Sequence, residues 1–396
     1  MNETLPRPRL STIGSMRTDA LLKKLLTLSA HEDITSFAVG LPNPDGFPIE
    51  ETAEAAQYVL KTMGRRALQY SATEGEPELR EAIAAYETSR GTPTRPEEVL
   101  IVTGSQQALD LTARAFVDPG DKILVENPTY LGAVSAFSLS RPHFEFLPAD
   151  AEGLDPEGIT GDMEDAKFAY VMPAFSNPTG LTISLERRKR LVERARKLDL
   201  WIIEDDPYGE LWYEKRPPQT IRSLAPERTL RLGTLSKILS PGMRLGYVTG
   251  DPELLDVLAE LKLSADMHSP VLTQLIAARL LTTGVIEKNL PAVRKIYRDR
   301  GTFMLACLEK YMPRDAGISW TRVEGGMFIW VTLPEHIDAM KLMPEAIAAK
   351  VSYVPGAACF ALGDKKNHMR LSFVTVPEER IEAGVRALAG VIARHL

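Results

Sequence analysis

The sequence predicts an α/β protein with a mostly parallel sheet covered by helices, together with a smaller α+β unit. Short β-branched segments alternate with helical segments through the middle of the chain, and this alternation stops after Pro270. Strands that alternate with helices favour a parallel sheet covered on both faces. Polar residues follow several of these strands, at the edge of the sheet where ligands bind in such folds.

Seven segments carry the strand pattern: residues 98–104, 122–126, 143–147, 168–173, 200–205, 229–233 and 245–250. The first of them ends in Gly104, after which Ser105 can cap a helix whose apolar residues recur at helical spacing. A charged helix is expected over residues 184–198, between the fourth and fifth strands. The result is a predicted seven-stranded sheet with helical crossovers.

The chain after Pro270 has helices and strands without strict alternation. Helices are expected over residues 271–281 and 285–312, strands over 318–333 with a break at Gly325-Gly326, over 351–354 and over 369–374, and a last helix with Ile381, Val385, Leu388 and Ile392 on one face. We therefore expect a large domain over residues 51–285 and a C-terminal small domain over 286–396. Residues 1–50 are expected to form an N-terminal arm and part of the small domain.

Composition sets several classes of protein aside. The 396 residues are 44% hydrophobic and 25% charged, which suits a soluble globular protein. The net charge of −6 makes nucleic acid or an anionic membrane an unexpected partner, and no segment approaches the ~18 apolar residues of a membrane helix. The cysteines are Cys307 and Cys359, and the histidines are scattered, so we expect no disulfide framework, no metal site and a cytoplasmic location.

Lys237 is the first of several polar residues in apolar strand-end contexts. It follows the sixth predicted strand, and partial desolvation there would lower its pKa and free its amine to form an imine. Thr234, Ser236 and Arg244 surround it and could bind an anion such as a phosphate. The alternative is a surface lysine in a loop.

Further polar residues follow other strands of the predicted sheet. Asp205 and Asp206 end the fifth strand, where buried carboxylates need a metal, a protonated heterocycle or a role as helix caps. Gly104 precedes the helix-start donors Ser105 and Gln106, which suit a phosphate or an ordinary helix cap.

Two segments that begin with Asn-Pro complete the pattern. Tyr130 ends Asn127-Pro128-Thr129-Tyr130 and places an aromatic ring after the second strand, where simple packing is the alternative. Asn177 begins Asn177-Pro178-Thr179-Gly180, which taken alone is a loop.

In their joint order these segments resemble the class I/II pyridoxal-phosphate-dependent aminotransferases, which have fold type I. The resemblance is carried by Gly104-Ser105-Gln106, Asn127-Pro128-Thr129-Tyr130, Asn177-Pro178-Thr179-Gly180, Asp205-x-x-Tyr208, Ser236-Lys237 with Arg244, and Arg370 in Met369-Arg370-Leu371-Ser372-Phe373. Gly40-Leu41-Pro42-x-Pro44 and Leu68-Gln69-Tyr70-Ser71-x-Thr73-x-Gly75 point to the branch of 2-aminoadipate and kynurenine aminotransferases. The match extends over roughly residues 15 to 390.

The resemblance implies pyridoxal 5′-phosphate as the cofactor and catalytic roles for Lys237, Asp205 and Tyr208. Lys237 would hold the cofactor as an internal aldimine and then move a proton at the substrate Cα. Asp205 would pair with the pyridine nitrogen and keep it protonated, so that the ring can accept electrons. Tyr208 and Asn177 would hydrogen-bond the cofactor's 3′-oxygen.

The family's remaining contacts fall on matching positions of this sequence. Tyr130 would stack on the pyridine ring, and Arg370 would bind the substrate α-carboxylate with Gly40 and Asn177 beside it. The phosphate would be bound by Gly104, Ser105, Gln106, Thr234, Ser236 and Arg244. Tyr70 would reach this phosphate from the neighbouring subunit, which implies a homodimer.

The implied reaction moves the amino group of an L-amino acid to a 2-oxo acid by a ping-pong mechanism, with glutamate and 2-oxoglutarate as one expected pair. The alternatives are a lyase, decarboxylase or oxidase of the same fold and, more remotely, an aminotransferase-like regulator, which needs ~60 further residues for its DNA reader. Arg17, Lys23 or Lys24 on an N-terminal helix could bind a distal carboxylate, or could simply be solvated.

Overall fold

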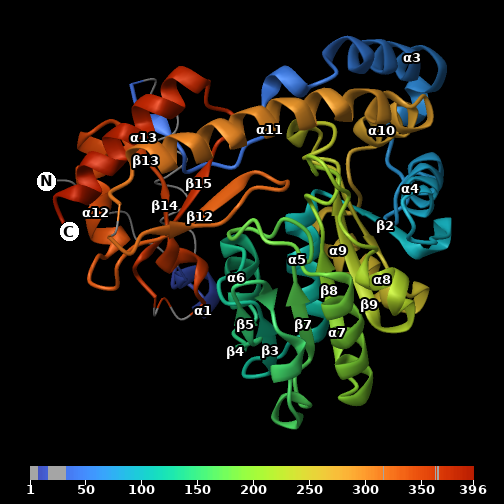
Figure 1. Ribbon diagram of the computed structural model, residues 1–396. Coiled ribbons are helices and arrows are strands. Elements are labelled where there is room, and N and C mark those ends of the chain that lie inside the picture. Colours follow the sequence, from blue (N-terminus) through green and yellow to red (C-terminus); the bar gives the residue numbers. More distant parts are fainter. Residues whose placement is uncertain (1–7, 17–32, 315, 362, 364) are drawn as a thin grey trace, which may run out of the picture.

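The computed structural model describes residues 8–16, 33–314, 316–361, 363 and 365–396 (Figure 1). The expectations for Arg17, Lys23 and Lys24 lie outside the described residues. Within the described part, no helix combines the length and the apolar character that crossing a bilayer requires.

The larger sheet is mostly parallel and has seven strands, as the sequence predicts. Its strands are β2 (Val99–Val102), β3 (Lys122–Val125), β4 (His143–Phe146), β7 (Phe168–Val171), β8 (Trp201–Asp205), β9 (Thr229–Thr234) and β10 (Gly246–Thr249). They lie in the order β2-β10-β9-β8-β7-β3-β4. The β10 strand is antiparallel to both of its neighbours, and the other pairs are parallel. All residues of β2 and β7 are buried, which explains their continuous apolar runs.

Helices cover this sheet and extend from it (Figure 1). They are α3 (Ile49–Ala67), α4 (Pro77–Ser89), α5 (Ser105–Phe116), α6 (Leu131–Ser138), α7 (Leu185–Lys197), α8 (Ile221–Leu224), α9 (Pro252–Asp266) and α10 (Val271–Thr282). The predicted charged helix is α7, which begins where the Ser184 hydroxyl accepts the backbone N–H of Arg187. The short α1 (Thr12–Ser15) and a hairpin of β5 (Ala149–Asp150) and β6 (Gly153–Leu154) lie outside these layers.

The C-terminal part forms a four-stranded antiparallel sheet with its own helices. Its strands are β11 (Ser319–Trp320), β12 (Phe328–Thr332), β14 (Val354–Pro355) and β15 (His368–Ser372), in the order β11-β12-β15-β14. The helices are α11 (Val285–Tyr311), α12 (Ala339–Ala348) and α13 (Glu378–Ala393). The predicted apolar face of the last helix, Ile381, Val385, Leu388 and Ile392, is buried.

The N-terminal arm joins this smaller unit rather than the larger sheet. Its strand β1 (Thr35–Ser36) pairs in parallel with β13 (Val351–Ser352). Further along, the backbone N–H of Ser372 on β15 donates to the carbonyl of Phe37 at 2.7 Å. The arm therefore passes beside the smaller sheet just before residues 38–42, which reach the cavity described next.

Candidate active site

A cavity of about 480 Å³ lies where the carboxyl ends of the larger sheet face the arm and the smaller sheet. The predicted residues that line it are Gly40, Ser105, Gln106, Tyr130, Asn177, Asp205, Tyr208, Thr234, Ser236, Lys237, Arg244 and Arg370. Two predicted residues do not line it. Gly104 precedes α5 behind Ser105, and Tyr70 is 74% exposed on the surface.

Asp205 is a buried carboxylate at the end of β8 with one oxygen unused. Its Oδ2 accepts a hydrogen bond from the Tyr170 hydroxyl at 2.7 Å, and its Oδ1 is buried and has no hydrogen-bond partner among the residues that the structure describes. Burial raises its pKa to about 7; the neighbouring Asp206 charge acts in the same direction, against the Tyr170 hydrogen bond and the Arg231 charge. A carboxylate held this way is suited to a cationic N–H donor in the cavity.

Lys237 lines the same cavity from the loop that follows β9. Its Nζ donates to the carbonyl oxygen of Gly40 at 3.2 Å. Burial lowers its pKa to about 8, and the charges of Arg370 and Arg244 act in the same direction. About a tenth of this amine is therefore uncharged at pH 7, far more than for an exposed lysine, and the uncharged form is the one that attacks a carbonyl.

Arg370, Asn177 and Tyr208 form a connected buried group on the side of the smaller sheet. The Nη1 of Arg370 donates to Asn177 Oδ1 and its Nη2 to the Ala38 carbonyl, each at 2.7 Å. The Nδ2 of Asn177 makes a long contact of 3.5 Å with the Tyr208 hydroxyl. Within the described part of the chain no carboxylate lies within ion-pair distance of Arg370, so this buried guanidinium is suited to a ligand's carboxylate.

The start of α5 forms an anion-binding corner with the Lys237 loop. Gly104 has a φ of 77°, and a Cβ there would lie 2.6 Å from Arg244 Nη2. The first turn of a helix leaves backbone N–H groups without helical partners, and they attract anions. Ser105, Thr234 and Ser236 add hydroxyl groups at the cavity wall, and Arg244 adds a charge. This corner can hold a phosphate.

Tyr130 lies at another wall of the cavity, where it precedes α6. A Cβ on Gly132 would lie 2.5 Å from Tyr130 Cζ, so glycine at this position leaves room for the ring. The amide of Gln106 donates to the Gly132 carbonyl at 3.1 Å and ties α5 to this turn. The ring thus lines the cavity beside the anion-binding corner.

Sequence reasoning missed three contributors to the site. They are Tyr170, which holds Asp205; the Ala38 carbonyl, which accepts from Arg370; and Phe328, whose ring centroid lies 4.3 Å from Arg370 Cζ. A tyrosine inside the apolar strand 168–171 signals a need for a hydroxyl partner, because a buried Tyr O–H is usually hydrogen-bonded. Nothing in the local sequence marks the other two contributors.

The cavity therefore combines four chemical features within one volume. Among the described residues, a buried carboxylate oxygen lacks a partner and a guanidinium has only neutral partners, an amine has a lowered pKa, and a corner is suited to an anion. These features fit a phosphorylated cofactor with a ring nitrogen and an aldehyde, which defines the class of pyridoxal-phosphate-dependent enzymes.

The family model for aminotransferase class I and II matches residues 32–388, and the chain belongs to this family. Aromatic-amino-acid aminotransferase 1 of Thermococcus litoralis is 41% identical over 384 residues, 95% of this chain and 92% of that protein. The solved structure of Pyrococcus horikoshii kynurenine aminotransferase with PMP is 41% identical, with a TM-score of 0.93 over 98% of this chain and 97% of that one. The α-aminoadipate aminotransferase of Thermus thermophilus, complexed with N-(5′-phosphopyridoxyl)-L-leucine, is 39% identical, with a TM-score of 0.88 over 96% and 95% of the chains.

These similarities confirm the predicted family, fold class and cofactor. The protein is a fold type I aminotransferase that uses pyridoxal phosphate and acts on amino acids. The role of each residue in the cavity stays a prediction.

Proposed function

We propose that this enzyme transfers the amino group of an L-amino acid to a 2-oxo acid through Lys237, by a ping-pong mechanism. The observation that carries this proposal is that Lys237, Asp205 and Arg370 line one cavity. When bound, pyridoxal phosphate supplies an aldehyde and a ring that accepts electrons from the substrate Cα. The chain's own residues bind and orient the reactants and move the protons.

Lys237 is proposed to attach to the cofactor and later to act as the base and acid at the substrate Cα. Both tasks require an amine that is uncharged for part of the cycle, and a pKa lowered to about 8 by burial supports them. The unused Oδ1 of Asp205 is proposed to accept a hydrogen bond from the protonated pyridine nitrogen. Tyr170 would hold the other oxygen of the carboxylate in place.

The rest of the cofactor would be held by residues at the ends of β2, β3, β7, β8 and β9. Tyr208 and Asn177 are proposed to hydrogen-bond the 3′-oxygen, and Tyr130 to stack on the ring. We assign the phosphate to the anion-binding corner, which comprises Gly104, Ser105, Gln106, Thr234, Ser236 and Arg244.

Arg370 is proposed to bind the substrate α-carboxylate, with Gly40 and Asn177 beside it. Its planar fork can bind both carboxylate oxygens and so set the rotation of the substrate about the Cα bond. Its contacts to Asn177 Oδ1 and the Ala38 carbonyl hold the guanidinium in place, and its Cζ lies 4.3 Å from the Phe328 ring centroid.

Replacement of Arg370 by lysine is expected to raise the KM for both amino and oxo acids about 10- to 100-fold, because the charge remains but the two-point grip is lost. Steady-state kinetics with both substrates would measure this change. Cofactor affinity should change less than the KM values, because Arg370 acts on the cofactor-binding residues through its hydrogen bond to Asn177. An unchanged KM would assign the carboxylate to another residue.

Glutamate and 2-oxoglutarate are proposed as one substrate pair, with an apolar or aromatic amino acid as the other donor. Lys237, Arg244 and Arg370 are the cations that line the cavity within the described residues, and each already has a proposed partner. This favours an uncharged side chain for the second donor. Leu41 and Leu131 provide apolar wall beside them. The names of the aromatic-amino-acid and kynurenine relatives agree with such a donor.

The assay that tests this function incubates the purified enzyme with 2-oxoglutarate and a panel of amino donors. We expect stoichiometric formation of glutamate and of the oxo acid of the donor. Ammonia, carbon dioxide or peroxide as the main product would instead indicate a lyase, a decarboxylase or an oxidase. Arg17→Ala and Lys23→Ala variants test the distal carboxylate separately: unchanged activity with glutamate would exclude these two side chains from its recognition.

We also propose a homodimer in which Tyr70 reaches the phosphate of the partner's site. Leu68 and Tyr70 are each 74% exposed, and Met267 is 49% exposed beside His268, whose ring meets that of Tyr70 edge-on at 5.7 Å. This apolar surface adjoins the anion-binding corner, because Asp266 at the end of α9 accepts from the Thr103 hydroxyl at 2.8 Å. A partner chain on this surface would lie close to the phosphate.

The chain is proposed to divide at residues 50 and 285, with the arm counted in the small domain. The pairing of β1 with β13 supports this assignment of the arm, and α11 starts at Val285 and packs against α13. We propose a cytoplasmic location, which the free buried thiols of Cys307 and Cys359 support.

A further inference from the structure

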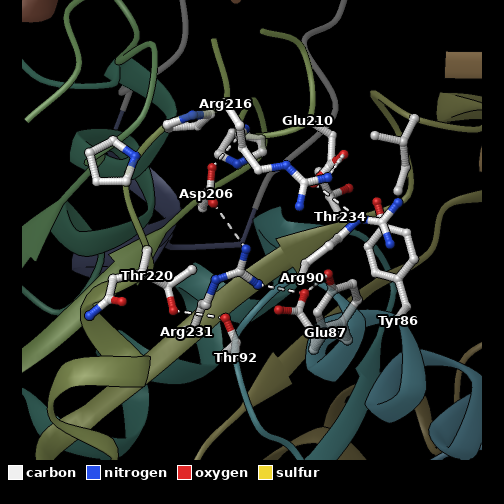
Figure 2. Close-up of a pocket in the computed structure, with 17 residues that line it drawn as sticks. Tyr86, Glu87, Arg90, Thr92, Asp206, Glu210, Arg216, Thr220, Arg231 and Thr234 are labelled. Atoms are coloured by element: carbon white, nitrogen blue, oxygen red, sulfur yellow. Dashed lines mark hydrogen bonds and ion pairs between the residues drawn. The ribbon is translucent and has the colours of Figure 1, made fainter. Parts of the chain in front are cut away.

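A second, charged cavity of about 180 Å³ adjoins the active-site cavity. Figure 2 shows the residues that line it. Pro207 and Thr234 line both cavities. Figure 2 shows the guanidinium of Arg231 between the carboxylates of Glu87 and Asp206. None of these three charged residues has a role in the mechanism proposed above.

The alternation of side chains along β8 separates its carboxylates, and Asp205 and Asp206 line different cavities. Successive side chains of a strand point to opposite faces of the sheet, so Glu204 and Asp205 diverge at the end of β8. Asp205 enters the active site, and Glu204 lies on the other face, with its Oε2 3.9 Å from Nε of Arg231. Asp206, the next residue, lines the charged cavity.

Arg231 is buried on β9 and connects this strand to α4 and to the turn that follows β8. Its Nη1 donates to Glu87 on α4 at 2.6 Å, and its Nη2 donates to Asp206 Oδ2 at 2.9 Å. The other oxygen of Asp206 accepts the backbone N–H of Gly209 at 2.8 Å. A Cβ on Gly209 would lie 2.6 Å from Asp206 Oδ2, so the turn closes tightly on this carboxylate.

The turn of residues 206–209, which Arg231 holds through Asp206, adjoins or contains two residues that line the active-site cavity, Asp205 and Tyr208. Asp205 precedes Asp206, and Tyr208 lies between Asp206 and Gly209, so a shift of the Asp206 side chain would move both. Charge matters as well, because an unpaired Asp206 carboxylate would oppose the ionisation of Asp205 next to it. Arg231 offsets that charge and thereby keeps Asp205 available as an anion.

We propose that Arg231 is a positioning residue of the cofactor site: by binding Asp206, it fixes the turn of residues 206–209 and favours the ionised form of the Asp205 carboxylate. This inference rests on the proposed role of Asp205 as the partner of the pyridine nitrogen. It assigns the buried ion pair a function in cofactor binding in addition to its contribution to the fold.

The charged and titratable neighbours of Asp205 and Arg231 come from every element packed against them. Asp205 is faced by Tyr170 on β7, by Tyr208 and Asp206 of the turn, and by Arg231. Arg231 is faced by Glu87 on α4, Glu204 on β8, Asp206, and Tyr247 on β10, whose hydroxyl donates to Glu87. Arg188 and Arg222 are further cations near Glu204.

The test measures the Kd of pyridoxal phosphate for the cofactor-free protein between pH 5 and 9, by titration of its visible absorbance. For Arg231→Met we expect a Kd at pH 7 raised about fivefold or more, and the pH below which binding weakens shifted upward, since a tenfold decrease in the acidity of Asp205 lowers its ionised fraction at pH 7 from about one half to about one tenth. Asp206→Asn should shift that pH downward. The double variant should bind within about threefold of Asp206→Asn, because the carboxylate adjacent to Asp205 is replaced by a neutral amide in both.

Arg216→Met is the matched control, because Arg216 lines the same cavity, is half-exposed and contacts Glu210 rather than Asp206. It should leave both the Kd and its pH dependence unchanged. Circular dichroism establishes that each variant is folded, and Asp206→Asn tests the charge coupling even if Arg231→Met fails to fold.

Two results would overturn the inference. One is a folded Arg231→Met protein with wild-type Kd and pH dependence, and the other is a pH dependence that does not respond to Asp206→Asn. A purely structural role of Arg231 would lower affinity equally at every pH and leave the double variant as weak as Arg231→Met. Asp205→Asn separates this result from failure of the proposed site: if that variant also binds normally, the assignment of Asp205 itself is wrong.

Discussion

Replacement of Lys237 by alanine is expected to abolish turnover, with a loss of about 10⁴-fold or more, and to remove the visible absorption band of the bound cofactor. The amine is proposed to make the covalent attachment and to carry the proton at the substrate Cα, so its removal eliminates two functions together. Its position in the cavity and its pKa, lowered to about 8 by burial and the charges of Arg370 and Arg244, support both functions.

Lys237→Arg is the matched control, because arginine keeps the positive charge but does not form the imine. If the charge alone mattered, this variant would retain much of the activity. We expect it to be as inactive as Lys237→Ala, while both variants remain folded. Turnover above about 1% of wild type in Lys237→Ala, together with an intact visible band, would show that another group attaches the cofactor.

Asp205→Ala should lower kcat by about two to three orders of magnitude and weaken cofactor binding, since charge stabilisation in a buried site is worth several kcal/mol. The carboxylate has one oxygen held by Tyr170 and the other without a partner, so alanine removes the anion placed to meet the ring nitrogen. Asp205→Glu keeps the charge but places the carboxylate at a different distance from the pyridine nitrogen, and it is expected to retain part of the affinity for the cofactor. Wild-type kcat and Kd in Asp205→Ala would contradict the proposed pairing with the pyridine nitrogen.

The pH dependence of cofactor binding follows from the same carboxylate. Burial raises the pKa of Asp205 to about 7 in the cofactor-free protein, so the group is ionised above that pH and takes up a proton below it. Only the anion can balance the charge of a protonated pyridine nitrogen. Affinity for pyridoxal phosphate is therefore expected to fall as the pH decreases through about 7, and Asp205→Ala should lose this dependence.

Much of the fold could be predicted because each strand ends in a recognisable signal. The alternation of apolar strands and helices predicts the seven-stranded sheet, and Ser184 caps α7. The expectation that Ser105 caps its helix was wrong: Ser105 is the first residue of α5, and its N-cap is Gly104, which has no side chain to accept a capping hydrogen bond. The antiparallel direction of β10 could not be derived from this alternation. Residues 235–245 contain the Lys237 loop and no crossover helix, so the chain turns back beside β9.

The candidate site was predictable to the extent that it consists of residues at strand ends. Asp205, Asn177 and Tyr130 follow parallel strands, whose carboxyl ends meet at one edge. The contacts of Arg370 with Ala38 and Phe328 join segments far apart in the chain and depend on how the smaller sheet meets the larger one. Local patterns do not contain that information.

The pair Asp205-Asp206 shows where local reasoning stops. The sequence places two carboxylates at a strand end, and the resemblance favours the first as the cofactor partner. Why the second is tolerated becomes clear only in the structure, where Arg231 on the next strand binds Asp206 at 2.9 Å. An arginine inside an apolar strand, as in residues 229–234, is the signal that could have predicted a buried acidic partner.

The covalent role of Lys237 is tested most directly by reducing the purified holoenzyme with borohydride and mapping its peptides by mass spectrometry. We predict a single pyridoxyl label, located on the ε-nitrogen of Lys237. A protein that has been saturated with pyridoxal phosphate and yields either no label or a label on a different lysine would contradict the account.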